Sequence, residues 1–206
     1  MRLFDITPAI SPRLAVWPGD TKASREVLLD IDRGDNLTLS TLHATVHLGA
    51  HADAPNHYGA AAAIDERPLA PYLGRCRVLD VAVGRGERIA PGAIPQPAGA
   101  TRVLLRTGTY PNPEDFNEDF AALSVSLIDR LHDEGVVLIG IDTPSVDLFD
   151  SKDLPAHQAF LRNDMAILEG LALRGVPEGD YELIALPLKL EGFDASPVRA
   201  VLRELP

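Results

Sequence analysis

The segment "ATVHLGAHADAPNHYG", residues Ala44–Gly59, concentrates metal-binding residue types in a short stretch broken by glycine and proline. It contains His47, His51, Asp53 and His57, although the whole chain has only six histidines. Neutral imidazole nitrogens and carboxylate oxygens are the ligands of hydrolytic metal sites. A single histidine is more often an ordinary core or surface residue. Three histidines around one aspartate at this spacing instead predict a metal site.

The residues alone leave the conformation of this segment open. His47 and His51 are four positions apart, so one helical turn would place both on the same face. Gly49 and Pro55 favour a loop or an irregular turn equally well. Asp53 follows closely enough to reach the same ion, and its second oxygen can reach another. In either conformation, one short segment supplies several ligands.

Additional ligands are expected from another part of the chain, because one ion takes more donors than this segment offers. The candidate stretch is "LPAHQAFLRNDMAILEG", Leu154–Gly170, which contains His157, Asp164 and Glu169. By sequence alone, these three residues are explained equally well as parts of an acidic surface helix.

Length and charge limit the classes of function. The 206 residues suit one domain with a substantial core, and the hydrophobic content of 46% is that of an ordinary globular protein. The net charge of -11, without any cluster of lysine and arginine, disfavours nucleic acid as a partner. No apolar run approaches the roughly 20 residues needed to span a bilayer. No signal peptide is recognisable, so a cytoplasmic location without a membrane partner is expected.

The sequence pattern predicts a strand-rich α/β fold. Branched and aromatic residues between Pro, Gly and Asp predict strands over Arg2–Thr7, Arg25–Asp32, Leu37–Val46, Cys76–Val83, Arg102–Thr107, Val136–Asp142 and Tyr181–Leu188. Helices are expected over Ser124–Gly135 and Pro155–Asp164. Several strands are almost continuously apolar, which indicates burial on both faces. We therefore expect a single domain over residues 1–206 with mixed strand directions.

Four blocks of sequence carry a family resemblance. "HLGAHADAPNHY" matches the signature His-x-Gly-x-His-x-Asp-x-Pro-x-His, and "DITPAISPRLAVWPGD", "GIDTPSVD" and "GDYELIALPLKLEGFDASPVRAVL" match in order along the chain. Together they resemble the metal-dependent cyclase-like hydrolases, and within that group the bacterial kynurenine formamidases (arylformamidases). The resemblance covers nearly the whole chain. One departure is Ala50, where many relatives have Thr, and a small residue there should leave the ligands undisturbed.

The resemblance implies a site for two zinc ions, although manganese and cobalt accept the same donors. Carried over by position, His47, His51 and Asp53 bind one ion, and Asp53 also reaches the second. His157 binds the second ion and Glu169 contacts both.

Two further roles follow from the resemblance. His57 matches a catalytic proton donor and acceptor, and Trp17 matches an aromatic residue that contacts the substrate. The alternative for Trp17, the only tryptophan, is an anchor in the core or an interface. Asp164 matches no role and is set aside.

The implied fold is a swivelling β/β/α domain that assembles as a homodimer or larger oligomer. The implied reaction is the hydrolysis of N-formyl-L-kynurenine to L-kynurenine and formate, a step of tryptophan degradation. Two alternatives stay open: another amidohydrolase of the same group, such as an isatin-type cyclic amide hydrolase, and a metal-binding protein without catalysis. No Gly-x-Ser-x-Gly motif supports a serine hydrolase.

Overall fold

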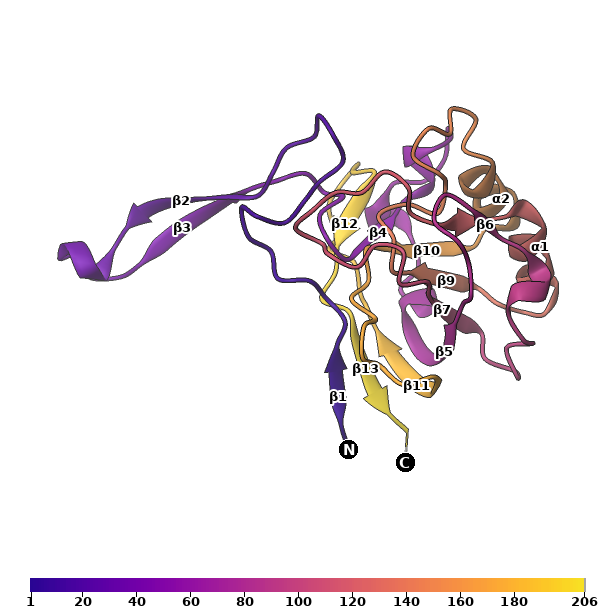
Figure 1. Ribbon diagram of the computed structural model, residues 1–206. Coiled ribbons are helices and arrows are strands. Elements are labelled where there is room, and N and C mark those ends of the chain that lie inside the picture. Colours follow the sequence, from indigo (N-terminus) through magenta and orange to yellow (C-terminus); the bar gives the residue numbers. More distant parts are fainter. Residues whose placement is uncertain (206) are drawn as a thin grey trace.

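A nine-stranded mixed sheet forms the centre of the computed structural model, which describes residues 1–205 (Figure 1). Its four middle strands are parallel, and the strands on both flanks are antiparallel. Both ends of the chain contribute strands, which pair with each other at one edge. In spatial order the strands are β1 (Leu3–Asp5), β13 (Val201–Glu204), β11 (Gly179–Ile184), β5 (Leu73–Asp80), β7 (Arg102–Arg106), β9 (Leu138–Ile141), β10 (Ala166–Glu169), β4 (His51–Asp53) and β12 (Ala195–Pro197).

The middle strands are buried on both faces, as their apolar runs predict. Successive residues of a strand point to opposite faces. In β7, Leu104 packs into one hydrophobic cluster, while Val103 and Leu105 pack into another on the opposite face. In β10, Leu168 and Ile167 divide in the same way. The sheet therefore separates two cores.

Two helices cover one face of the sheet (Figure 1). α1 (Val125–Asp133) begins after Ser124, whose hydroxyl accepts a hydrogen bond from the backbone N–H of Leu127 at 3.2 Å. α2 (Pro155–Asn163) has its proline at the first turn, where no N–H is needed. The other face is covered by flanking strands of the curled sheet, which contribute the side chains Ile6, Tyr181, Leu183 and Leu202. Within residues 1–205, no helix is long and apolar enough to cross a bilayer.

These observations confirm the predicted strand-rich α/β class with a mixed sheet. Both predicted helices form with ends within two residues of those expected. The predicted strand Arg25–Asp32 is too long, because the chain turns at Asp30 into a 3-10 helix, Ile31–Arg33. Within the large sheet, the sequence pattern missed the strands β4, β10, β12 and β13, and outside it the two-residue strands Arg88–Ile89 and Ala122–Leu123, because all of these are too short to show an alternation of their own.

A hairpin of β2 (Ser24–Leu29) and β3 (Leu39–His43) projects from the body of the molecule (Figure 1). We call residues 24–43 the hairpin arm. The two strands pair with each other and with no strand of the large sheet. Exposed leucines lie along the arm, including Leu28 and Leu42. A smaller parallel pair, β6 (Arg88–Ile89) and β8 (Ala122–Leu123), lies beside the helices.

Candidate metal centre

Neighbouring strands β4 and β10 bring the predicted ligands together. His51 and Asp53 are two residues apart on β4, so both side chains leave the same face of the sheet. Glu169 on β10 pairs directly opposite His51 in the antiparallel register. All three side chains are almost completely buried. The helical alternative for this segment is therefore wrong, because His51 lies on a strand and His47 lies in the loop before it.

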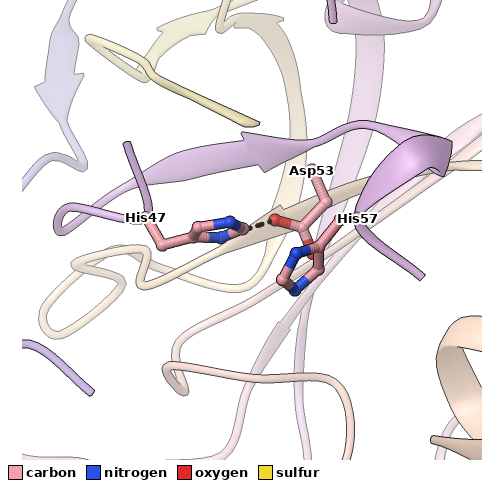
Figure 2. A group of neighbouring side chains, drawn as sticks. All are labelled: His47, Asp53 and His57. Atoms are coloured by element: carbon pink, nitrogen blue, oxygen red, sulfur yellow. Dashed lines mark ion pairs between the residues drawn. The ribbon is translucent and has the colours of Figure 1, made fainter. Parts of the chain in front are cut away.

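Asp53 lies at the centre of the cluster (Figure 2). Its Oδ1 is 3.2 Å from Nδ1 of His47 and 3.5 Å from Nε2 of His51. Its Oδ2 is 3.4 Å from Nε2 of His157, which projects from the first turn of α2. The two oxygens of one carboxylate thus face different histidines. This arrangement would let Asp53 bridge two ions.

Glu169 spans the same two groups of histidines. One carboxylate oxygen, Oε2, is 3.3 Å from Nε2 of His51, and the other, Oε1, is 3.6 Å from Nε2 of His157. The backbone N–H of Val146 donates a hydrogen bond to Oε1 at 2.7 Å. This bond fixes the orientation of the Glu169 carboxylate from the loop after β9.

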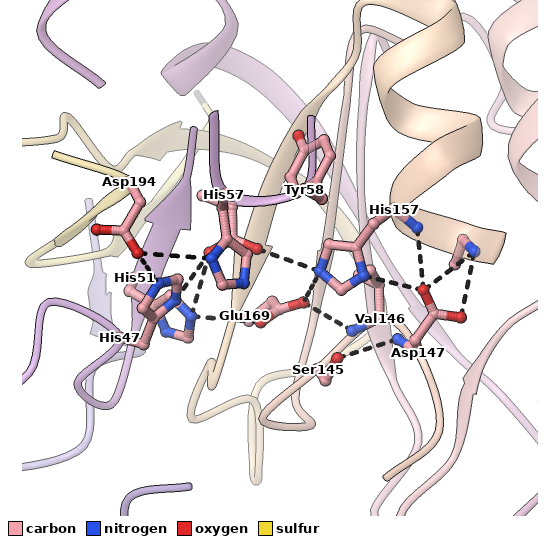
Figure 3. Close-up of polar contacts among 12 residues, drawn as sticks. His47, His51, His57, Tyr58, Ser145, Val146, Asp147, His157, Glu169 and Asp194 are labelled. Carbon is pink, nitrogen blue, oxygen red and sulfur yellow. Dashed lines mark hydrogen bonds and ion pairs between the residues drawn. The ribbon is translucent and has the colours of Figure 1, made fainter. Parts of the chain in front are cut away.

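The second ring nitrogens of His47, His51 and His157 each have a partner away from the cluster centre, and Figure 3 shows those of His47 and His157. Nε2 of His47 is 2.9 Å from a carboxylate oxygen of Asp194. Nδ1 of His51 is 2.8 Å from the carbonyl oxygen of Gly49. Such outer partners hold the tautomer and the ring orientation of histidines that bind metals. The nitrogens that face Asp53 and Glu169 are then left for an ion.

Asp147 is the corresponding partner of His157. Its Oδ2 is 2.9 Å from Nδ1 of His157 and accepts the backbone N–H of the same residue at 3.1 Å. It also accepts the N–H of Ala156 and an N–H of Arg88. Asp147 therefore caps α2 from the loop between β9 and the helix, in place of Leu154, the residue before the helix, which has no capping side-chain hydrogen bond.

The residues present fit a divalent metal ion. Among the described residues, Nε2 of His51 and both carboxylate oxygens of Asp53 are buried without a hydrogen-bond partner. Leaving such groups unpaired is costly, and a cation would satisfy all three atoms at once. Donor atoms of His51, Asp53 and Glu169 lie within 4.8 Å of one another, and so do those of His47, Asp53 and His57.

The electrostatics of the cluster also favour a positive charge. Burial alone would lower the pKa of His47, but hydrogen bonds to Asp53 and Asp194, together with the negative charges of Asp53 and Glu169, outweigh it and raise the pKa to about 9. Burial likewise opposes protonation of His157, but Asp147 and Asp53 raise its pKa to about 10. Burial would raise the pKa of Asp53, yet His157 and His47 hold it well below its usual value. In the absence of metal, protons on the imidazoles supply the charge.

His57 lies on the open side of the cluster (Figures 2 and 3). Strand β4 ends at Asp53, and a 3-10 turn, Pro55–His57, returns the chain toward the site. The His57 ring centroid is 4.2 Å from that of His47, and its Nδ1 is 3.5 Å from Asp194. Burial lowers the pKa of His57, so its imidazole is neutral near pH 7 and free to accept a proton.

A cavity of about 860 Å³ opens onto the cluster, and His57, His157 and Glu169 lie in its wall. Trp17 lines the same cavity and is partly exposed, but it also packs against other aromatic rings. Its ring centroid is 5.0 Å from that of Phe149 and 5.6 Å from that of Phe116. Trp17 is therefore packed against other rings, as expected of an anchor, and it also borders the cavity, so that its contact with a substrate stays a prediction.

The structure brings together every residue proposed for the site and leaves Asp164 outside. Asp164 is exposed at the end of α2 and pairs with Arg67 at 2.7 Å. The sequence-based interpretation gave no role to Asp147 or Asp194, although both contact histidines of the cluster. Their only signal was their place in two of the matching blocks, "GIDTPSVD" and "EGFDASP", because no spacing rule links them to His157 and His47.

The chain belongs to the putative cyclase family, whose model matches residues 4–148, and it is a hydrolase. Over its full length it is 47% identical to the kynurenine formamidase of Maricaulis maris (strain MCS10), an alignment that covers 100% of this chain and 99% of the relative. A solved structure described as a potential metal-dependent hydrolase with cyclase activity matches with a TM-score of 0.84 and 27% identity, covering 100% of this chain and 99% of the other.

An isatin hydrolase bound to the product analogue thioisatinate matches with a TM-score of 0.79 and 21% identity, covering 97% of this chain and 91% of the other. At that identity the likeness concerns the fold alone.

Proposed function

We propose that this chain hydrolyses N-formyl-L-kynurenine to L-kynurenine and formate with two zinc ions at the cluster around Asp53. The observation that carries the proposal is the pair of histidine groups that face opposite oxygens of this one buried carboxylate. The full-length relative named kynurenine formamidase supports the substrate. The proposed ligands are His47, His51, Asp53, His157 and Glu169.

The formyl amide resists water because its nitrogen lone pair is delocalised and the departing nitrogen needs a proton. Bound divalent ions would polarise the formyl carbonyl and lower the pKa of the attacking water. Asp53 and Glu169, both buried, would hold the ions. The outer partners Asp147 and Asp194 would keep the ligand rings aligned during turnover.

His57 is the proposed proton carrier. Its side chain is 35% exposed and lies in the cavity wall beside the cluster, whereas His51 and His157 are buried. A neutral imidazole can take the proton from the attacking water and return it to the departing aryl nitrogen. Asp194, at 3.5 Å from Nδ1 of His57, favours the imidazolium that exists between the two transfers.

The wall of the cavity suits an aryl group. Trp17, Tyr110 and Phe116 all line it, and they pack in edge-to-face pairs that hold each ring in place. Fixed aromatic faces bind an aryl ring with little loss of side-chain entropy. We propose that Trp17 contacts the aryl ring of the substrate.

Hydrolysis of formylkynurenine by the purified protein tests the proposal, measured before chelation, after chelation and after zinc is restored, with metal content followed throughout. Activity that is lost and regained with the zinc content supports it. A metal-loaded protein that is inactive on formylkynurenine but opens isatin would replace the formamidase with a cyclic amide hydrolase. A loaded protein that is inactive on both would favour a metal-binding protein without catalysis.

We also propose that residues 1–206 form one domain and that two copies, or more, assemble in the cytoplasm. The hairpin arm supports assembly. An isolated two-stranded hairpin is marginally stable in water, and this one carries exposed leucines and pairs with no strand of the large sheet. Burial of Leu28 and Leu42 against a second copy would stabilise it.

A further inference from the structure

The cavity wall contains two arginines, and the guanidinium of only one of them pairs with other groups of the described residues. Arg106 forms an ion pair with Asp80 and donates hydrogen bonds to the backbone carbonyls of Leu173 and Val176. Arg174 is exposed and has no ion pair or side-chain hydrogen bond within residues 1–205. Arg174 therefore presents an unpaired positive charge to the cavity.

A rigid turn carries Arg174. The N–H of Val176 donates to the carbonyl of Leu173 at 3.1 Å, which closes a β-turn with Arg174 and Gly175 at its corners. Gly175 has φ +82, as the third position of a type II turn requires. Because Arg106 binds both ends of this turn, the backbone of Arg174 is fixed before any ligand arrives.

The same wall connects Arg174 with the metal cluster. Every residue from Glu169 to Gly175 lines the cavity. The five steps from Glu169 to Arg174 span at most about 17 Å even when the chain is fully extended. A ligand in this cavity whose reacting group lies at the cluster can extend along this wall toward Arg174.

A second turn supplies an unpaired negative charge. The N–H of Asp20 donates to the carbonyl of Trp17 at 2.9 Å, and Gly19 has φ +95, so "WPGD" also forms a type II turn. Asp20 lines the cavity, is exposed, and forms no ion pair in the part of the chain that the structure describes. Its Oδ1 accepts the backbone N–H of Thr21 at 2.6 Å, which leaves its negative charge without a cationic partner. By contrast, the buried Asp142 in this wall accepts hydrogen bonds from Thr107 and Gly108.

We infer that Arg174 and Asp20 select the zwitterionic amino-acid end of the substrate, with Arg174 binding the α-carboxylate and Asp20 the α-ammonium. The assignment rests on the proposed function, because it takes formylkynurenine as the ligand. A planar guanidinium matches a carboxylate in a two-pronged geometry. An aryl amide without the amino-acid end would leave both charges unpaired. Arg174 and Asp20 are thus specificity-determining residues, whereas the cluster performs the hydrolysis.

The test compares two substrates of the metal-loaded enzyme: N-formyl-L-kynurenine, and ortho-formamidoacetophenone, which keeps the ring, the ketone and the formamide but lacks the amino acid. Arg174→Gln should lower kcat/KM for formylkynurenine about tenfold or more, mainly through KM, as expected for one charge-assisted pair. It should leave kcat/KM for the acetophenone unchanged, and Arg174→Lys should recover part of the loss for formylkynurenine. Lys189→Gln, which removes an exposed charge outside the cavity wall, should change neither substrate.

Asp20 is tested with the deamino analogue of formylkynurenine, which keeps the carboxylate. Asp20→Asn should lower kcat/KM for formylkynurenine several-fold and leave the deamino analogue unaffected. If Arg174→Gln lowers turnover of both substrates equally, or of neither, the assignment is overturned while the formamidase activity stands.

Calorimetric binding of the amino acid L-kynurenine separates this inference from the proposed function. If the wild type hydrolyses neither formamide, the proposed function fails. The affinity for L-kynurenine then still tests whether Arg174 binds the α-carboxylate. Binding that is weakened about tenfold in Arg174→Gln supports the inference, and equal binding by both proteins overturns it.

Discussion

Oδ2 of Asp147 lies 2.9 Å from Nδ1 of His157, and the same carboxylate caps the helix that carries this histidine. One buried group therefore sets both the position of the helix and the orientation of the ring. Arg88 balances its charge from strand β6. Because burial alone would raise the pKa of Asp147, the lowered pKa reflects these hydrogen bonds, with His157 the first of them.

Asp147→Asn should weaken metal binding, because an amide holds the His157 ring less firmly and leaves Arg88 unbalanced. Changes to such outer partners cost about 10–100-fold in metal affinity or activity. The measurement is competition with a chromogenic chelator, with Asp153→Asn, an exposed carboxylate beside the same helix, as the control. Unchanged affinity in Asp147→Asn would show that the helix alone positions His157.

Loss of Asp53 should be far more damaging than loss of Trp17. Asp53→Ala removes the carboxylate that faces three histidines, so both metal binding and activity should disappear. Trp17→Ala removes one aromatic face and should lower kcat/KM by about tenfold, with metal content unchanged. Metal analysis and steady-state kinetics on the same preparations check both. The ranking is wrong if Trp17→Ala is as inactive as Asp53→Ala.

Stability of the metal-free protein should depend on pH in a definite direction. Folding raises the pKa of His47 to about 9 and that of His157 to about 10, both from 6.5. Groups of this kind stabilise the fold below the unfolded pKa, and the contribution disappears as the pH rises through the folded value. The free energy of unfolding should therefore fall by on the order of 1 kcal/mol per pH unit for each histidine, between about pH 6.5 and 9 for His47 and between about pH 6.5 and 10 for His157.

The metal-loaded protein provides the comparison. Its imidazoles would bind ions through deprotonated nitrogens, so no proton is lost as the pH rises. Thermal unfolding of chelated and zinc-loaded protein should therefore diverge with increasing pH. Parallel curves would show that His47 and His157 carry no extra protons in the chelated state.

Gly170→Ala should disrupt the site through one contact. A Cβ on Gly170 would lie 2.1 Å from the carbonyl oxygen of Gly49, the same oxygen that lies 2.8 Å from Nδ1 of His51. The loop would have to move away from β10, so both stability and metal affinity should fall. Gly135→Ala is the matched control, because Gly135 also has positive φ but open space at its Cβ. It should cost about 1 kcal/mol of stability and leave metal binding intact.

Removing the exposed leucines of the hairpin arm should abolish assembly. Leu28→Ser with Leu42→Ser takes apolar surface from the proposed interface, so sedimentation should show a monomer where the wild type is a dimer or larger. Leu69→Ser, an exposed leucine outside the arm, should not change the mass. A wild type that is itself monomeric would contradict the proposed oligomer, and a double variant that stays oligomeric would place the interface elsewhere.

The sequence by itself determined the parts of this protein that local chemistry controls. The apolar runs predicted three of the four middle strands, β5, β7 and β9. Ser124 and Pro155 marked the two helix starts, and the signature from His47 to His57 indicated a metal site with most of its donors. These signals are readable because strand alternation, helix capping and ligand chemistry depend on neighbouring residues in the chain.

Only the tertiary structure decided how the donors meet. β4 and β10 are too short for a periodic signal, yet their register sets Glu169 opposite His51. Asp194 reaches His47 from a loop 147 positions away in the chain. Asp147 reaches His157 over 10 positions, because the loop before α2 folds back onto the first turn of the helix. Such pairings depend on packing between separate elements, which no local pattern records. The sequence also could not tell which cavity arginine is unpaired, because only the fold brings Arg106 to Asp80 and to the carbonyl of Leu173 and leaves Arg174 without such partners.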